Sequence, residues 1–154
     1  MRRLAISVLV IATLGVATRG QAVPKDWRVS LERTGCLGGC PAYKVIIEGS
    51  GSVTFLNSEN ETETGRLSPK EIRQLFELSE SESFLRKSTE SEQDCDGPHE
   101  TDWPSEIVSV TSNGHSRSVT HNEGCKVRPN TFLSKVIKLA EAIDRVTNSM
   151  FIKG

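Results

Sequence analysis

The chain has 154 residues, of which 36% are hydrophobic and 25% are charged, a composition typical of one globular domain. Lysine and arginine number 19 against 20 acidic residues, for a formal net charge of -1. This balance lacks the basic excess of nucleic-acid-binding proteins, so we expect no nucleic-acid partner. Beyond the N-terminal segment no apolar run approaches the roughly 18 residues of a membrane-spanning helix, so we expect no transmembrane segment in the mature chain.

The N-terminal segment has the layout of a secretory signal peptide. Two arginines follow Met1, residues 4–18 are almost uncharged and apolar, and small residues end at Ala22. We predict a signal peptide at 1–22 and a single exported domain at 23–154, periplasmic or secreted; cleavage after Ala17 and an uncleaved anchor remain alternatives. Because the leader holds three arginines, its removal changes the net charge from -1 to -4.

The first half of the mature chain predicts a strand, a hairpin and a helix. Residues 27–32 alternate apolar and polar side chains, and so do residues 42–57 on both sides of a Gly-Ser-Gly turn. Residues 58–65 are polar and are expected to form a loop. Ser68 and Glu71 form a capping box, with Pro69 at the first helical position and Leu67 as a staple onto Ile72, so a helix is expected to begin there and to bury Ile72, Leu75 and Phe76.

The second half predicts a long polar loop, a second hairpin and a closing helix. The loop covers residues 87–103. Asn113-Gly114 is a strong signal for a two-residue turn, which places Glu106 opposite His121 and turns the valines inward. Residues 129–146 have helical periodicity, with these residues expected to face the sheet: Phe132, Val136, Ile137, Ala140 and Ile143.

Together these elements predict an α+β fold with the order β-ββ-α-ββ-α. We expect an antiparallel sheet of about five strands with two helices packed on one face.

The four cysteines of a small exported chain predict disulfides. Three pairings are possible, and we favour Cys36 with Cys40 and Cys95 with Cys125. In the chain-entropy treatment the first bond contributes roughly 2 kcal/mol and the second, which closes a loop of about 31 residues, nearer to 4 kcal/mol. The second bond would also fix the long polar loop to the end of the second hairpin.

A motif surrounds the first cysteine pair: Thr34-Gly35-Cys36-Leu37-Gly38-Gly39-Cys40-Pro41-Ala42-Tyr43. It is accompanied by the Gly49-Ser50-Gly51 turn, a Thr101-Asp102-Trp103-Pro104 element and a strand that ends at His121. This set resembles the bacterial domain-of-unknown-function family 6438 over about residues 27–147. The resemblance implies an exported bacterial α+β domain and brings no established activity.

Cys36 and Cys40 have a second interpretation as a metal or redox pair. Their C-x3-C-P spacing is similar to that of copper-delivery proteins with a thioredoxin-like fold, and His121 could supply a third ligand, since thiolates select Cu(I). Adding Cys125 would complete a Cys3His zinc set. Strand periodicity at residues 43–47, where the thioredoxin-like fold has a helix, opposes the copper analogy, and an oxidising compartment favours disulfides.

A polar site is expected around Glu106 and His121, with Asp102 and Tyr43 as further candidates. A partly buried ion pair explains the first two without catalysis. The chain has three histidines and no G-x-S-x-G, H-E-x-x-H or P-loop motif, so we assign no catalytic residue and no cofactor. One acidic group could bind Ca²⁺ but lacks the twelve-residue calcium pattern, so a solvated loop is the simpler interpretation: Asp94, Asp96, His99, Glu100 and Asp102.

The sequence therefore favours an exported, non-catalytic module of the bacterial envelope whose disulfide-held loops bind an unidentified protein or envelope component. The alternative is a thiol-dependent carrier of copper or zinc, or a redox protein, that uses Cys36, Cys40 and His121. An enzyme based on Glu106 and His121 is a third hypothesis.

Overall fold

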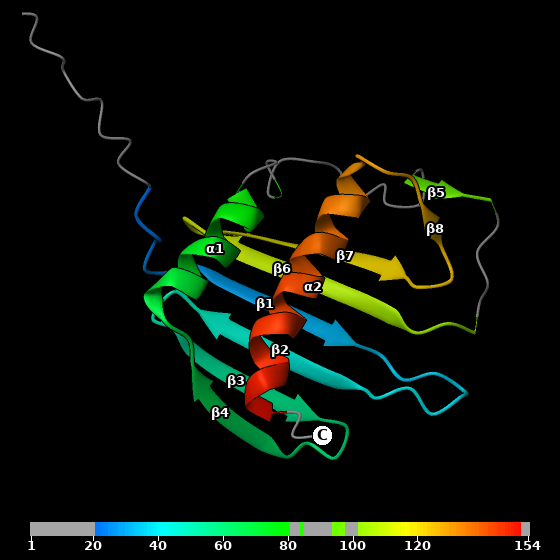
Figure 1. Cartoon of the computed structure of the whole chain (residues 1–154), viewed down its shortest axis with the longest axis horizontal. Helices are drawn as coiled ribbons and strands as arrows, with labels where there is room; N and C mark the ends of the chain where they lie inside the picture. Colours follow the sequence, from blue (N-terminus) through cyan, green and yellow to red (C-terminus); the bar gives the residue numbers. More distant parts are fainter. Residues whose placement is uncertain (1–20, 81–83, 85–93, 98–101, 152–154) are drawn as a thin grey trace, which may run out of the picture.

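The computed structural model describes residues 21–80, 84, 94–97 and 102–151. Helices α1 (Pro69–Glu80) and α2 (Phe132–Phe151) lie on one face of an antiparallel sheet (Figure 1). The sheet has the order β4-β3-β2-β1-β6-β7, with β1 (Arg28–Arg33), β2 (Tyr43–Glu48), β3 (Ser52–Asn57), β4 (Thr62–Arg66), β6 (Ser105–Ser112) and β7 (His115–Asn122). Strands β5 (Cys95–Asp96) and β8 (Lys126–Val127) form a small second sheet.

The predicted α+β class is confirmed, and the predicted strand count is slightly too low. The main sheet has six strands instead of about five. The predicted signal peptide lies almost entirely in residues 1–20, outside the described part of the chain. No helix among the described residues is long and apolar enough to cross a membrane.

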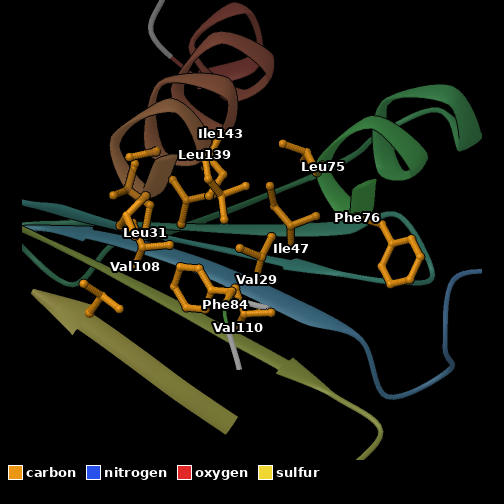
Figure 2. Packing of buried hydrophobic residues seen from close by; sticks show 14 of the residues in the cluster. Val29, Leu31, Ile47, Leu75, Phe76, Phe84, Val108, Val110, Leu139 and Ile143 are labelled. Carbon is orange, nitrogen blue, oxygen red and sulfur yellow. The ribbon is translucent and has the colours of Figure 1, made fainter. Parts of the chain in front are cut away.

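The hydrophobic core lies between the inner face of the sheet and the two helices (Figure 2). Because side chains alternate along a strand, every second residue of β1, β2 and β6 points inward, and in the middle of each strand these positions hold valine, leucine or isoleucine. Trp27, just before β1, is also buried and donates a hydrogen bond from Nε1 to Ser79 Oγ at 3.1 Å. The layer is completed from the helices by Ile72, Leu75, Phe76, Leu133, Val136, Leu139, Ala140 and Ile143.

The two predicted hairpins form, and the second has the expected register. Strands β2 and β3 are joined through Gly51, whose φ of 87° suits glycine. Strands β6 and β7 are joined by Asn113-Gly114, and the pairing places Val108 opposite Val119 and Glu106 opposite His121.

Strand β4 corrects the prediction of a loop over residues 58–65. Its residues are mostly exposed because it is the outermost strand, so they show no apolar alternation from which a strand could be predicted. The turn before it is held by Asn57, whose Oδ1 accepts hydrogen bonds from the amides of Glu59 and Glu61 at 3.0 and 2.9 Å. Strand β4 is therefore stabilised by backbone pairing with β3 and not by burial of one of its faces.

Helix α2 begins later and ends later than the predicted range 129–146. Asn130 has a φ of 61°, which is not helical, and the Thr131 hydroxyl accepts a hydrogen bond from the Ser134 amide at 3.3 Å, which caps the helix. At its end, Phe151 stacks on Phe55 of β3 with ring centroids 5.2 Å apart. Ile137, predicted to face the sheet, is only partly buried, whereas Leu133 and Leu139 are fully buried.

Helix α1 starts with the predicted capping box. The Glu71 carboxylate accepts hydrogen bonds from the amide and hydroxyl of Ser68 at 2.8 and 2.6 Å, and the Ser68 Oγ lies 3.4 Å from the Glu71 amide. The hydrogen bonds from Ser68 hold the pKa of Glu71 below its ordinary value of 4.5. The carboxylate therefore stabilises the helix only in its charged form.

Replacing Ser68 with alanine should lower the free energy of unfolding by about 1 kcal/mol at neutral pH. The folded-state pKa of Glu71 is lowered, so its contribution is present above pH 4.5 and is lost as the pH falls through the lower folded-state value. Urea denaturation at pH 7 and pH 3 should show the difference between wild type and Ser68→Ala at pH 7 and a smaller one at pH 3. Ser58→Ala, at an exposed turn, is the matched control and should leave the free energy of unfolding unchanged at both pH values.

Candidate functional site

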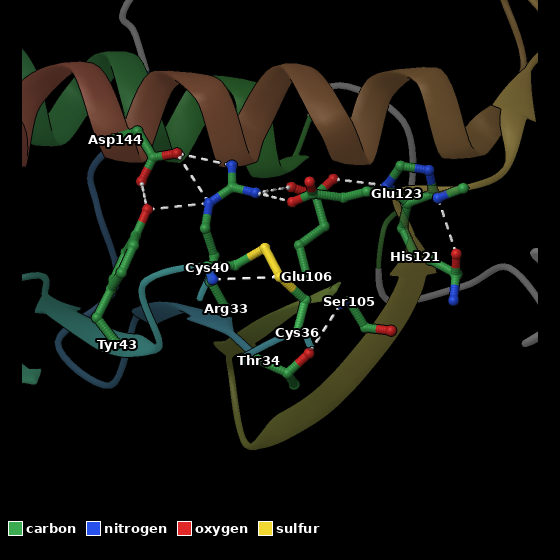
Figure 3. Close-up of polar contacts among 12 residues, drawn as sticks. Arg33, Thr34, Cys36, Cys40, Tyr43, Ser105, Glu106, His121, Glu123 and Asp144 are labelled. Atoms are coloured by element: carbon green, nitrogen blue, oxygen red, sulfur yellow. Dashed lines mark hydrogen bonds and ion pairs between the residues drawn. A yellow bond between two sulfur atoms is a disulfide. The ribbon is translucent and has the colours of Figure 1, made fainter. Parts of the chain in front are cut away.

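A row of polar side chains crosses four strands at one end of the inner face of the sheet. Tyr43 on β2 pairs with Arg33 on β1, Arg33 pairs on its other side with Glu106 on β6, and Glu106 pairs with His121 on β7. The next row along the strands is apolar: Val45, Leu31, Val108 and Val119. The alternation that buries this apolar row also turns the polar row toward helix α2 (Figure 3).

Arg33 lies at the centre of the polar row and connects its members. Its Nη2 atom donates a hydrogen bond to Asp144 Oδ2 at 2.7 Å, and its Nε donates to the Tyr43 hydroxyl at 2.9 Å. Its Nη1 lies 3.2 Å from Glu106 Oε2 and also forms an ion pair with Glu123. One guanidinium group thus serves three carboxylates, which leaves the cluster with an excess of negative charge.

The electrostatic environment fixes the protonation states of Arg33 and Tyr43. Burial lowers the pKa of Arg33, but the hydrogen bond and charge of Asp144 raise it by more, so the pKa lies above its usual value. Burial and the same carboxylate raise the pKa of Tyr43 above its usual value. Tyr43 is therefore a neutral hydroxyl, which donates a hydrogen bond to Asp144 Oδ1 at 2.7 Å.

Glu106 and His121 form the pair expected from the hairpin register. The His121 Nδ1 lies 2.9 Å from Glu106 Oε1, and the two residues are only 7% and 3% exposed. The other ring nitrogen, Nε2, is buried and has no hydrogen-bond partner among the described residues. The imidazole ring of His121 is thus held in place by Glu106 at Nδ1, while its Nε2, which can donate or accept a hydrogen bond, is left unsatisfied among the described residues.

The predicted polar site is brought together in part. Tyr43 joins Glu106 and His121 through Arg33. Asp102 is exposed, and within the described residues no hydrogen bond or ion pair connects it to the other three. Three of the four predicted residues therefore lie in the polar row, and Asp102 does not.

Sequence reasoning missed three members of the cluster: Arg33, Glu123 and Asp144. A signal for Arg33 exists, because it continues the inward alternation of Val29 and Leu31 and is charged where an apolar residue is expected. Asp144 likewise follows Ala140 by one helical turn on the buried side of α2. Glu123 follows the end of β7 and carries no pattern of its own.

Two disulfides hold the loops near the same end of the sheet. Cys36 is bonded to Cys40 and Cys95 to Cys125, which is the pairing we favour from the sequence. The first bond closes the loop after β1, and the second connects β5 to the segment after β7. The Cys40 amide also donates a hydrogen bond to Cys36 Sγ at 3.2 Å.

The predicted metal ligands are engaged with other groups in this structure. The sulfurs of Cys36 and Cys40 are bonded to each other, and His121 contacts Glu106. The described ranges contain no cluster of three or more His, Cys, Asp or Glu side chains that could hold a metal ion. Of the acidic group, His99 and Glu100 lie outside the described residues, while Asp94 Oδ2 accepts a hydrogen bond from the Leu133 amide at 3.0 Å.

Two large apolar side chains are exposed on the loops at this end. Leu37, inside the loop that the Cys36–Cys40 bond closes, is 91% exposed, and Trp103, just before β6, is 51% exposed. The segments that carry them are connected, because the Thr34 amide donates to the Ser105 carbonyl at 2.9 Å and the Ser105 amide donates to Thr34 Oγ1 at 2.8 Å. Both exposed side chains are therefore presented by anchored backbone.

Comparison with known protein families gives a match over most of the chain. Residues 27–147 match the family described as "Domain of unknown function (DUF6438)". Among curated proteins no significant match to the chain is found. The match covers all strands of the main sheet, helix α1, both disulfides and most of α2. The chain therefore belongs to the DUF6438 family.

Proposed function

We propose that the protein is an exported, non-catalytic binding module of the bacterial envelope, periplasmic or secreted. Its partner is a protein or envelope component that contacts the Leu37 loop and Trp103. The leader-like residues 1–22 support export, and two disulfides are typical of proteins outside the reducing cytosol.

The observation that carries this proposal is the near-complete exposure of Leu37 within a short disulfide-closed loop. An exposed leucine is common, but one inside a covalently closed loop loses little conformational entropy when a partner covers it. Trp103, of a residue type enriched in binding hot spots, lies on a neighbouring segment. The rigid β-sheet below positions both, as is common for binding loops.

Replacing Leu37 with serine should weaken partner binding by about 10-fold or more, because covering an exposed leucine side chain with a partner contributes about 1.5–3 kcal/mol. The measurement is affinity capture from an envelope extract, followed by titration of the purified partner against each variant. Trp103→Ser should have a similar effect. Leu78→Ser is the matched control, because Leu78 is a 42% exposed leucine on helix α1, away from these loops.

A partner that binds wild type and Leu37→Ser equally would contradict the proposal. Loss of binding in Leu78→Ser as well would indicate that the partner contacts the helices and not the loops. The disulfide bonds and the melting temperature of each variant should match those of wild type.

A second candidate function is favoured by the hydrogen bond from the Cys40 amide to Cys36 Sγ. An amide donor stabilises a thiolate, so Cys36 would be the better leaving group if a partner thiolate attacked Cys40. This geometry supports the hypothesis that Cys36 and Cys40 take part in thiol-disulfide exchange. The related reading as a copper or zinc carrier with His121 requires reduction of the bond first, since the ligand is the thiolate.

Thiol counting separates the two candidate functions. The binding module should be exported as a chain that begins at Val23, with an intact mass lower by four hydrogens than the reduced form and with no thiol alkylated by iodoacetamide. Two rapidly alkylated thiols, at Cys36 and Cys40, together with bound metal would favour the carrier. Two such thiols without metal would favour the redox protein.

A further inference from the structure

A cavity of about 400 Å³ lies at the end of the sheet opposite the polar row. The β2–β3 turn, the start of helix α1 and the segment before β1 come together at this end of the sheet (Figure 1), and residues of these segments line the cavity. Its size is within the range of small-molecule sites. Its apolar lining comes from Val23, Leu67, Pro69 and Ile72.

The wall of the cavity is fixed by backbone contacts. The Gly51 amide donates to the Glu48 carbonyl at 2.8 Å, and the Leu67 amide donates to the Gly51 carbonyl at 2.9 Å. A Cβ atom on Gly51 would lie 2.9 Å from the Leu67 carbonyl oxygen, so the turn and the helix entrance approach as closely as glycine allows. This wall of the cavity is therefore preformed.

Among the described residues of this lining, Arg66 and Arg73 have the only charged side chains, and in a chain that begins at Val23 the α-amino group adds a further positive charge. Arg66 Nη1 donates a hydrogen bond to the Ser50 carbonyl at 3.1 Å, which holds the guanidinium at the rim. No carboxylate of the described residues lies within ion-pair distance of either guanidinium. Two positive charges thus border an apolar cavity without a counter-ion from the described chain.

Three carboxylates at this end of the molecule are engaged elsewhere. Glu48 pairs with Arg28 at 2.9 Å, Asp26 Oδ2 accepts a hydrogen bond from the Gly114 amide at 2.6 Å, and Glu71 is held by Ser68. They therefore do not neutralise the two arginines of the cavity.

We propose that this cavity binds an amphipathic carboxylate, with a fatty acid of medium chain length as its ligand class. The carboxylate pairs with Arg66 and Arg73, since guanidinium groups bind carboxylates through paired hydrogen bonds. The alkyl chain covers the apolar lining between Val23 and Ile72. This inference is independent of the proposed binding module, whose loops lie at the other end of the sheet.

The test is calorimetric titration of decanoate, below its micelle concentration, into the exported protein. One decanoate should bind per chain, and octanoate should bind about 10-fold more weakly because two methylene groups are lost from the apolar contact. Arg66→Gln and Arg73→Gln should each weaken decanoate binding about 10-fold. Lys70→Gln, an exposed residue between them in sequence and absent from the lining, is the matched control and should change the affinity less than about 2-fold.

Three results would overturn the inference. Equal binding of decanol and decanoate would show that the carboxylate is not recognised. Acetate or inorganic phosphate binding as tightly as decanoate would show an anion site without an apolar part. Absence of decanoate binding at millimolar concentration would remove the site. The Leu37→Ser variant should bind decanoate normally, so failure of this inference and failure of the binding-module proposal are distinguishable.

Discussion

Replacing Arg33 with alanine is expected to lower the free energy of unfolding by about 3–5 kcal/mol, the cost of removing one partner from a buried ion pair. Glu106, only 3% exposed, loses the guanidinium 3.2 Å away, and Asp144 loses its contact at 2.7 Å. The cluster would then hold three carboxylates and no arginine. Urea denaturation at pH 7, followed by circular dichroism, measures the change.

The matched control for this prediction is Arg28→Ala. Arg28 also forms an ion pair with a carboxylate at 2.9 Å, but both side chains are about half exposed, so the loss should be about 0–1 kcal/mol. In addition, the double variant Glu106→Gln with Arg33→Met should be more stable than Arg33→Ala, because the buried charge of Glu106 is removed together with its partner. Equal effects of Arg33→Ala and Arg28→Ala would show that the polar row does not contribute to stability through burial.

Removing the Cys95–Cys125 bond by serine substitution of both residues should lower the free energy of unfolding by about 4 kcal/mol. The bond spans a sequence separation of 30 residues and ties β5 to the segment after β7, so its loss enlarges the unfolded ensemble considerably. Domains typically have only about 5–15 kcal/mol of stability, so the urea midpoint should fall steeply.

The double variant Cys36→Ser with Cys40→Ser gives the comparison. Cys36 and Cys40 are separated by only 4 residues in sequence, so the free energy of unfolding should fall by about 2 kcal/mol. This variant should also release Leu37 from its closed loop, which weakens partner binding while the sheet stays folded. A larger loss for this variant than for the Cys95 and Cys125 variant would contradict the chain-entropy explanation.

The fold could be predicted where local patterns and burial agree. Alternation at residues 27–32, the capping box at Ser68 and the Asn113-Gly114 turn each specify an element by themselves, and the register of the second hairpin follows from its turn. Strand β4 could not be predicted, because an exposed edge strand is formed by backbone pairing with β3. The late start of α2 depends on the left-handed Asn130, which helical periodicity does not reveal.

The polar cluster shows a different limit of sequence reasoning. The pair of Glu106 and His121 is local to one hairpin, so its register could be predicted. Arg33 and Asp144 are more than 100 residues apart in sequence and meet only because α2 crosses the end of β1. Nothing in one sequence specifies the direction of that crossing, although a charged residue at an inward strand position indicates that a partner must exist.

The central position of β1 determines when the sheet can be completed during synthesis. β1 pairs with β2 on one side and with β6 on the other, although β6 begins only at Ser105. A nascent chain therefore has its first four strands long before β6, which pairs with the other edge of β1, and β7, which pairs with β6. Until β6 arrives, the open edge of β1 is available to chaperones, and folding waits until most of the domain has emerged.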